Sequence, residues 1–312
     1  MRVVLSAAIM LVTNYFKLIK NSKLTERIAM LGKVQTGLFS IVFFLLSCCA
    51  NAEEPQKFSP TKSNIVYAGE NSADNPRKLD LYLPIKTKQG FPVLIWFHGG
   101  GLVSGSKNQL NDQRIAEYWR TRGVGLVNVD YRMSPQVQFP AYIQDAAQAV
   151  AWVMQNAKKL GADPRRIYVG GHSAGAYLAA MLAFDENYLK QNAVDVNSIA
   201  GFVSLSGQMT THFTVRKERG LSDLLIIVDD AAPSHYVRKE IPHLLLLIGD
   251  HDWPARLEEN QMLFAQLTQV AKATNVNFKV ISNRDHNSIY DRITEPKDET
   301  YEAIATFMNL PH

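Results

Sequence analysis

The chain has 312 residues, of which 46% are hydrophobic and 20% charged, and a chain of this length can bury a full core without disulfides or a metal. Its formal net charge of +4 originates at the N-terminal end, where residues 1–52 hold six of the 33 Lys and Arg residues against one acid. The remainder has 27 basic and 28 acidic residues, which excludes a basic nucleic-acid-binding surface there.

The N-terminal end carries the features of an export signal. An apolar run of nine residues, Leu38 to Leu46, is too short to span a bilayer as a helix, and Lys33 precedes it. Ala50-Asn51-Ala52 follows as a small-x-small cleavage site. We therefore expect residues 1–52 to be an N-terminal extension and signal peptide, and residues 53–312 to be the catalytic domain, exported to the periplasm or secreted.

Alternatives to a cleaved signal remain open at this end. Met30 is an alternative start to Met1, and a retained apolar run, Val3–Phe16 or the later one, would be a membrane anchor. Leu45-Leu46-Ser47-Cys48 resembles a bacterial lipobox, which would tether the protein to a membrane through a lipid on Cys48. Both cysteines of the chain, Cys48 and Cys49, lie here, and a mature chain without cysteine suits export.

Beyond a polar lead-in at residues 53–64, apolar patterns predict alternating strands and helices. The predicted strands are Lys78–Leu83, Val93–Phe97, Gly125–Asp130, Ile167–Gly170, Ile199–Ser204, Leu244–Ile248 and Val276–Ile281. The predicted helices are Asn111–Arg122, Ile143–Lys158, Ala174–Phe184, Ala255–Lys272 and Asp298–Met308. This alternation predicts an α/β fold with a mostly parallel central sheet flanked by helices on both faces. Residues 208–242 are longer than a normal connection and predict a small cap insertion.

Two glycine-rich turns follow predicted strands. His98-Gly99-Gly100-Gly101 comes directly after Val93–Phe97, and consecutive glycines let backbone N–H groups point at one ligand atom, as acyl transfer requires. Gly171-His172-Ser173-Ala174-Gly175 lies between a strand and an alanine-rich helix, where a GxSxG turn exposes a serine nucleophile. A flexible connection is the alternative for either turn alone, and the two together favour a serine hydrolase.

A serine nucleophile needs a histidine to accept its proton and a carboxylate to orient that histidine. The carboxyl ends of the last two predicted strands supply both, Asp250 or Asp252 after one and His286 after the other. His251 and His243 compete with His286. The order Ser173, acid, His286 is the chain order of this architecture.

The sequence resembles the α/β-hydrolase carboxylesterases with an HGGG oxyanion motif, from about Lys78 to the C-terminus. Besides the two turns, the resemblance covers Asp130-Tyr131-Arg132-Met133-Ser134-Pro135 and Asp163-Pro164-Arg165-Arg166-Ile167. It implies an α/β-hydrolase fold with Ser173 as nucleophile, His286 as base and Asp252 as acid. Oxyanion donors would be the N–H groups of Gly100, Gly101 and Ala174. His172 and the Gly249-Asp250-His251-Asp252 acid loop depart from the hormone-sensitive-lipase pattern and resemble the broader feruloyl-esterase-like group, which includes arylformamidases.

Other polar residues receive structural interpretations. Adjacent side chains on the elbow point apart, so His172 is not expected to be the base, and His98 is expected to support the oxyanion loop. We expect Asp130, Arg132 and Asp145 to form an ion-pair network, and Asp229 with Asp230 to be solvated or to brace the loop that holds them. Scattered histidines predict no metal site, and the absence of GxGxxG predicts no dinucleotide cofactor.

The sequence therefore predicts a serine hydrolase that cleaves small-molecule carboxylic esters through an acyl-enzyme, without a cofactor. An arylformamidase- or peptidase-like amide hydrolase on the same fold is the enzymatic alternative. A non-catalytic binding protein is the alternative from another class, and it would be expected to lose members of the triad. The acyl and alcohol groups and the oligomeric state are not predicted.

Overall fold

The structure is a computed structural model, and it describes residues 58–87, 89–222 and 224–311. The predicted signal peptide, the alternative start at Met30 and the candidate lipid site at Cys48 lie outside the described residues. No helix in the described ranges combines the length and the apolar character needed to cross a membrane.

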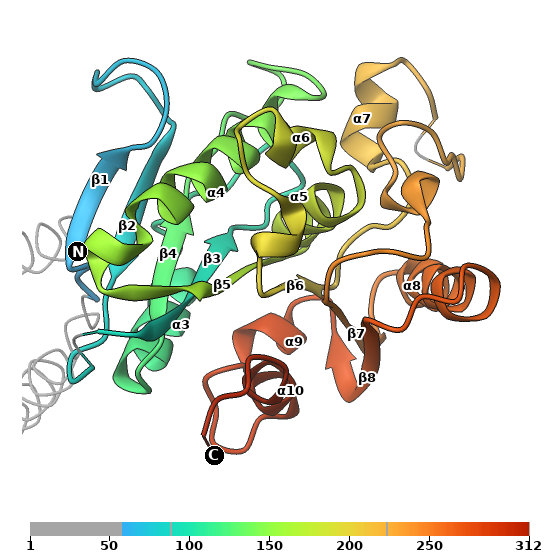
Figure 1. The fold of residues 1–312 in the computed structure, drawn as a ribbon. Coiled ribbons are helices and arrows are strands. Elements are labelled where there is room, and N and C mark those ends of the chain that lie inside the picture. The colour runs from blue at the N-terminus through green and yellow to red at the C-terminus, as the bar shows by residue number, and fades with distance from the viewer. Residues whose placement is uncertain (1–57, 88, 223, 312) are drawn as a thin grey trace, which may run out of the picture. The chain divides into compact units, whose positions relative to one another are not determined.

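A twisted sheet of eight strands runs through the domain in the order β1-β2-β4-β3-β5-β6-β7-β8 (Figure 1). β1 pairs antiparallel with β2, and β2 with β4, whereas every later pair is parallel. The strands are β1 Lys62–Val66, β2 Lys78–Tyr82, β3 Phe91–Phe97, β4 Gly125–Val129, β5 Ala162–His172, β6 Gly201–Leu205, β7 Leu244–His251 and β8 Val276–Asp285.

Helices cover both faces of the sheet, because successive strand residues point to opposite sides. In β3, Val93, Ile95 and Phe97 join one apolar cluster, while Leu94 and Trp96 join the other. The first cluster includes residues of α4 Ala141–Leu160, α5 Ala174–Phe184, α6 Asn187–Lys190 and α8 Arg256–Ala265. The second includes residues of α3 Leu110–Thr121, α9 Ser288–Asp291 and α10 Glu299–Phe307 (Figure 1).

The predicted fold class, a mostly parallel sheet between two helical layers, is confirmed. The predicted lead-in is wrong for its last residues, since Lys62 to Asn64 belong to edge strand β1, whose exposed side chains gave no apolar signal. β5 begins earlier than predicted, at Ala162. The predicted helix Ala255–Lys272 ends as an α-helix at Ala265 and continues as a π-helical turn, Gln266–Val270.

Residues 208–242 connect β6 to β7 and hold two short helices, α7 Phe213–Glu218 and the 3₁₀ helix Pro233–Tyr236. Arg219, just after α7, pairs with Asp229 at 2.5 Å and with Asp230 at 2.9 Å. These two aspartates therefore brace the segment. Another 3₁₀ turn, Val196–Ser198, precedes β6. The division of the chain into a leader, a catalytic domain and a small cap stays a prediction.

Candidate active site

The serine of the GxSxG turn sits on a strained connection between β5 and α5. Ser173 has φ 57° and ψ −114°, a left-handed conformation that non-glycine residues seldom adopt. Its N–H donates to the carbonyl of Leu205 at 2.9 Å. A Cβ on Gly175 would lie 1.9 Å from the carbonyl oxygen of Phe97, so glycine lets α5 approach β3. The turn thus holds the Ser173 hydroxyl at the carboxyl end of the sheet.

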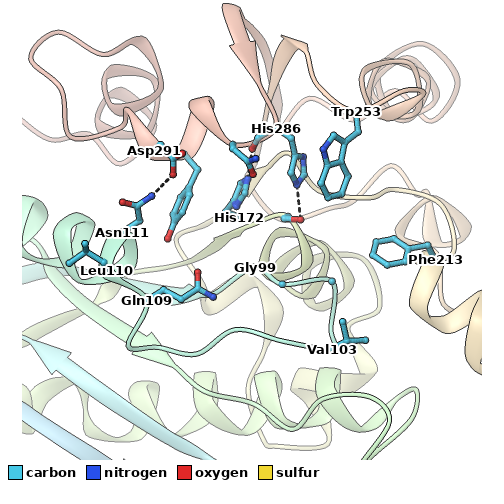
Figure 2. Close-up of a pocket in the computed structure, with 15 residues that line it drawn as sticks. Gly99, Val103, Gln109, Leu110, Asn111, His172, Phe213, Trp253, His286 and Asp291 are labelled. Carbon is cyan, nitrogen blue, oxygen red and sulfur yellow. Dashed lines mark hydrogen bonds between the residues drawn. The ribbon is translucent and has the colours of Figure 1, made fainter. Parts of the chain in front are cut away.

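Ser173, His286 and Asp252 form one hydrogen-bonded chain. His286 Nε2 lies 2.8 Å from Ser173 Oγ, and His286 Nδ1 lies 2.8 Å from Asp252 Oδ1. A carboxylate only accepts hydrogen bonds, so Nδ1 carries the proton and Nε2 presents a lone pair to the serine hydroxyl. Figure 2 shows the bond from His286 to the serine at the centre of the pocket.

The carboxylate of Asp252 is fully enclosed and held by other donors as well. Ser206 Oγ donates to Oδ2 at 2.6 Å, and the N–H of Trp253 donates to Oδ1 at 2.6 Å. Burial acts to raise the pKa of Asp252, but the hydrogen bonds and charge of His286, with those of Ser206 and Trp253, outweigh it and hold the pKa below its ordinary value. Asp252 is therefore a stable counter-ion for a protonated His286.

The competing candidates lie away from Ser173. Asp250 accepts from the N–H of Arg284 at 3.1 Å and from the ring of His251 at 2.8 Å, so it braces the paired carboxyl ends of β7 and β8. The His251 side chain is 68% exposed. His243 directly precedes β7, at the strand end opposite Asp250, and its ring contacts Phe307 at a tilt of 38° with centroids 4.3 Å apart.

The HGGG turn presents backbone N–H groups beside the serine. Gly100 has φ 114°, and a Cβ there would lie 2.0 Å from the carbonyl oxygen of Ser104, so only glycine fits. Among the described residues, no acceptor is found for the N–H of Gly100 or Gly101. Ala174 is the first residue of α5, where helix N–H groups have no partner within the helix. Gly100 and Gly101 thus line the same pocket as Ser173, and Ala174 directly follows the serine in the chain.

Buried side chains hold this turn in place. His98 Nδ1 contacts the carbonyl of Gly99 at 2.6 Å, and Tyr131 Oη donates to the carbonyl of His98 at 2.8 Å while its ring stacks on the imidazole. Burial lowers the pKa of His98 to about 4. At the far end of the turn, the N–H of Lys107 donates to Asp130 at 2.6 Å.

The expected ion-pair network of Asp130, Arg132 and Asp145 is two separate groups. Arg132 binds Asp145 in a bidentate pair, at 2.8 and 2.7 Å, which anchors the chain after β4 to α4. Asp130 instead faces Lys107, whose N–H donates to it at 2.6 Å and whose ammonium lies 4.0 Å from it.

A pocket of about 700 Å³ opens above Ser173. Figure 2 shows Val103, Phe213 and Trp253 on one side of the Ser173–His286 bond, and Leu110, Asn111 and Asp291 on the other. Trp253 stacks on the His286 ring, with centroids 3.6 Å apart. One side of the pocket is thus apolar and the other mixed, which suits a small molecule with two unlike ends.

The sequence analysis did not predict the part that Ser206 and Trp253 play in this site. It also did not predict that His172 contacts His286. Ser206 directly follows β6, and a polar residue at the carboxyl end of a parallel strand was an available signal. Trp253 and His172 gave none, since their positions depend on side-chain directions across different elements. Among the described residues, no group of three or more His, Cys, Asp and Glu side chains could hold a metal ion.

The chain is similar to known esterases in sequence and in fold. The family model described as BD-FAE matches residues 79–267, more than half of the chain. A probable isoprenylcysteine alpha-carbonyl methylesterase ICME of Oryza sativa subsp. japonica is 33% identical over 266 residues, covering 76% of this chain and 62% of that protein. Carboxylesterase NlhH of Mycobacterium tuberculosis strain H37Rv is 37% identical over 103 residues, covering 33% of this chain and 32% of that protein.

Among solved structures, esterase B from Lactobacillus rhamnosis superposes with a TM-score of 0.67 and 23% identity, covering 90% of this chain and 96% of that one. At that identity the match shows the fold alone. This chain spans less than two thirds of the length of either sequence relative. The family match, the carboxylesterase relatives and the eight-stranded sheet agree, and they establish that the chain belongs to the BD-FAE family and has the α/β-hydrolase fold.

Proposed function

We propose that this protein hydrolyses carboxylic esters of small molecules, with Ser173 as nucleophile, His286 as general base and Asp252 as the orienting acid. The observation that carries the proposal is the chain of 2.8 Å hydrogen bonds from Ser173 through His286 to Asp252, at the floor of an open pocket. The similarity to carboxylesterases supports the choice of an ester bond.

Acylation begins when Ser173 Oγ attacks the ester carbonyl while its proton passes to His286 Nε2. The tetrahedral intermediate carries a negative oxygen, which the N–H groups of Gly100, Gly101 and Ala174 stabilise. Asp252 stabilises the imidazolium, which then gives its proton to the leaving alcohol.

Deacylation repeats these steps with water in place of the serine. His286 takes a proton from water as the water attacks the acyl-enzyme carbonyl, and it returns that proton to Ser173 Oγ as the acid leaves. No step requires a cofactor. The pocket surface formed by Val103, Phe213 and Trp253 is the apolar contact for one end of the substrate.

Ser173→Ala is expected to abolish hydrolysis of a chromogenic short-chain ester. The Ser173 hydroxyl lies 2.8 Å from His286 Nε2, and among the described residues no other hydroxyl is hydrogen-bonded to that nitrogen. The fall should be on the order of 10⁶-fold in kcat, as for loss of a triad nucleophile. A fluorophosphonate probe should label the wild type and not the variant. Ester hydrolysis by the folded variant at the wild-type rate would contradict the assignment of Ser173 as nucleophile.

The same substrate panel separates ester from amide chemistry. We expect hydrolysis of short-chain esters to exceed that of matched formamides and peptides, since the similarity to carboxylesterases is the support for an ester bond. Faster cleavage of formamides than esters would replace the proposed function with an arylformamidase activity.

We further propose that residues 30–52 direct export, because an apolar run and a small-x-small site follow Lys33. N-terminal sequencing of the protein from its host should begin at Glu53. A product that keeps the apolar run, or that carries lipid on Cys48, would replace cleavage with a membrane tether.

A further inference from the structure

His172 lies directly before Ser173 and contacts the general base from below. Its Nε2 is 2.7 Å from the backbone carbonyl oxygen of His286, within a buried contact. The His172 residue is 6% exposed, and it lies at the carboxyl end of β5. The strand that carries the nucleophile is therefore joined by a side chain to the backbone of the base.

The contact fixes the chemical state of His172. A carbonyl oxygen only accepts hydrogen bonds, so Nε2 must carry a proton. Burial, together with the charge of His286, lowers the pKa of His172 to about 3, so the ring stays neutral near neutral pH. A neutral His172 does not repel His286 when that ring becomes an imidazolium during the reaction.

The plane of the His172 ring is fixed by Tyr290 of α9. The two rings stack at 4.6 Å with an interplanar angle of 3°. Tyr290 Oη donates to Asp112 Oδ1 at 2.7 Å, and Trp96 Nε1 donates to the same oxygen at 2.8 Å. This buried chain, from α3 and β3 to α9, keeps the Nε2–H of His172 aimed at one point.

The base needs such support because it lies outside the sheet. β8 ends at Asp285, so the backbone of His286 is not held by a strand ladder. The ring of His286 is held by Asp252 and Trp253, but neither contact fixes its carbonyl.

We propose that His172 is a positioning residue for the ester hydrolysis proposed above: its Nε2–H holds the backbone of His286 so that the base meets Ser173 at reactive distance. This assignment rests on the proposed function. It gives the residue before the nucleophile a part in catalysis that acts through the base.

His172→Gln and His172→Met form a matched pair that tests the donor. Both side chains are unbranched and similar in length, and both lose the stacked ring, but only Gln can donate to the His286 carbonyl. We expect kcat of His172→Met to fall by about 10- to 100-fold, the effect of a small misplacement of a catalytic group. His172→Gln should recover most of that loss.

The loss should appear in kcat and in the rate of fluorophosphonate labelling, with KM close to wild type, because His172 borders the pocket with only 6% of its surface exposed. His235→Met, at an exposed histidine in the 3₁₀ helix Pro233–Tyr236, is the control and should retain activity. Equal kcat values for folded His172→Gln and His172→Met would overturn the proposal.

A measurement on the wild-type protein does not depend on the folding of variants. Nitrogen-15 NMR of the imidazoles should show His172 as the neutral Nε2–H tautomer throughout the pH range of activity. An Nδ1–H tautomer, or a protonated ring, would overturn the proposal. If the wild type hydrolyses no ester, the proposed function fails separately, because the tautomer measurement needs no turnover.

Discussion

Two histidines lie at the site: His286 contacts Ser173, and His172 contacts the backbone of His286. Their hydrogen-bond partners give them different properties. His286 has a carboxylate at Nδ1, which stabilises a positive ring, whereas His172 has a carbonyl at Nε2 and is buried beside the first. His286 is thereby suited to accept a proton, as proposed, whereas the ring of His172 stays neutral. Sequence position alone suggests neither role, because each role follows from the atom that the ring faces.

A buried carboxyl below the site should make stability depend on pH. Burial raises the pKa of Asp112 to about 7, although hydrogen bonds from Tyr290 and Trp96 oppose the rise. The unfolded chain ionises Asp112 near its ordinary value of 3.8, and the folded protein only near 7. The free energy of unfolding that this group contributes is therefore fully present below pH 3.8. It is lost as the pH rises from 3.8 to about 7.

Asp112→Asn cannot ionise, so it should remove this part of the pH dependence. We subtract the melting temperature of the variant from that of the wild type at each pH. This difference should be smaller at about pH 8 than at about pH 5. Thermal melts of both proteins at the two pH values measure it. A constant difference would contradict the shifted pKa of Asp112.

At the scale of elements, the turn after β3 carries two of the proposed oxyanion donors, and its shape depends on Gly100. Gly100→Ala would place a Cβ 2.0 Å from the carbonyl of Ser104, at a φ of 114°. The turn must shift, and its donors with it, so we expect kcat to fall by about 10²- to 10³-fold.

Gly90→Ala is the matched control for this prediction, since Gly90 also has a positive φ, 72°, but has open space around it and lies before β3. Its kcat should stay near that of the wild type. A wild-type kcat for Gly100→Ala in an ester assay would show that the turn does not hold the oxyanion.

The parallel strands could be predicted from sequence because buried strands read as short continuous apolar runs. β3 and β7 are of this kind, and the triad candidates follow from the ends of such strands. β1 could not be found, because an edge strand with exposed polar side chains lacks that signal. The four-residue helix α9 is too short to show a period, although it carries Tyr290 below the site.

At the scale of the whole molecule, the antiparallel edge of the sheet is joined to the catalytic turn by one buried cation. Lys107 Nζ lies 3.1 Å from Asp80 of β2 and 2.9 Å from Asn64 of β1, and its side chain is 2% exposed. Its own N–H binds Asp130 after β4. Edge strands β1 and β2 therefore share buried contacts with the segment that follows the proposed oxyanion donors.

Lys107→Met should leave the buried carboxylate of Asp80 without its cationic partner, bonded among the described residues only to the N–H of Asn64, and lower the free energy of unfolding by about 3–5 kcal/mol. Urea denaturation measures the change. Asp80→Asn combined with Lys107→Met should recover part of the loss, because the uncompensated charge is then removed. A decrease in the free energy of unfolding of less than about 1 kcal/mol, as is typical of surface ion pairs, would show that water reaches the Lys107–Asp80 pair.

The left-handed backbone of Ser173 limits which nucleophile can ever occupy the elbow. Cysteine, like serine, has one heavy atom beyond Cβ, and it can be accommodated at φ 57° at a similar cost. Threonine has the same hydroxyl, but its branched Cβ makes this conformation a severe outlier. The chain can therefore exchange oxygen for sulfur at this position more readily than it can add a methyl group.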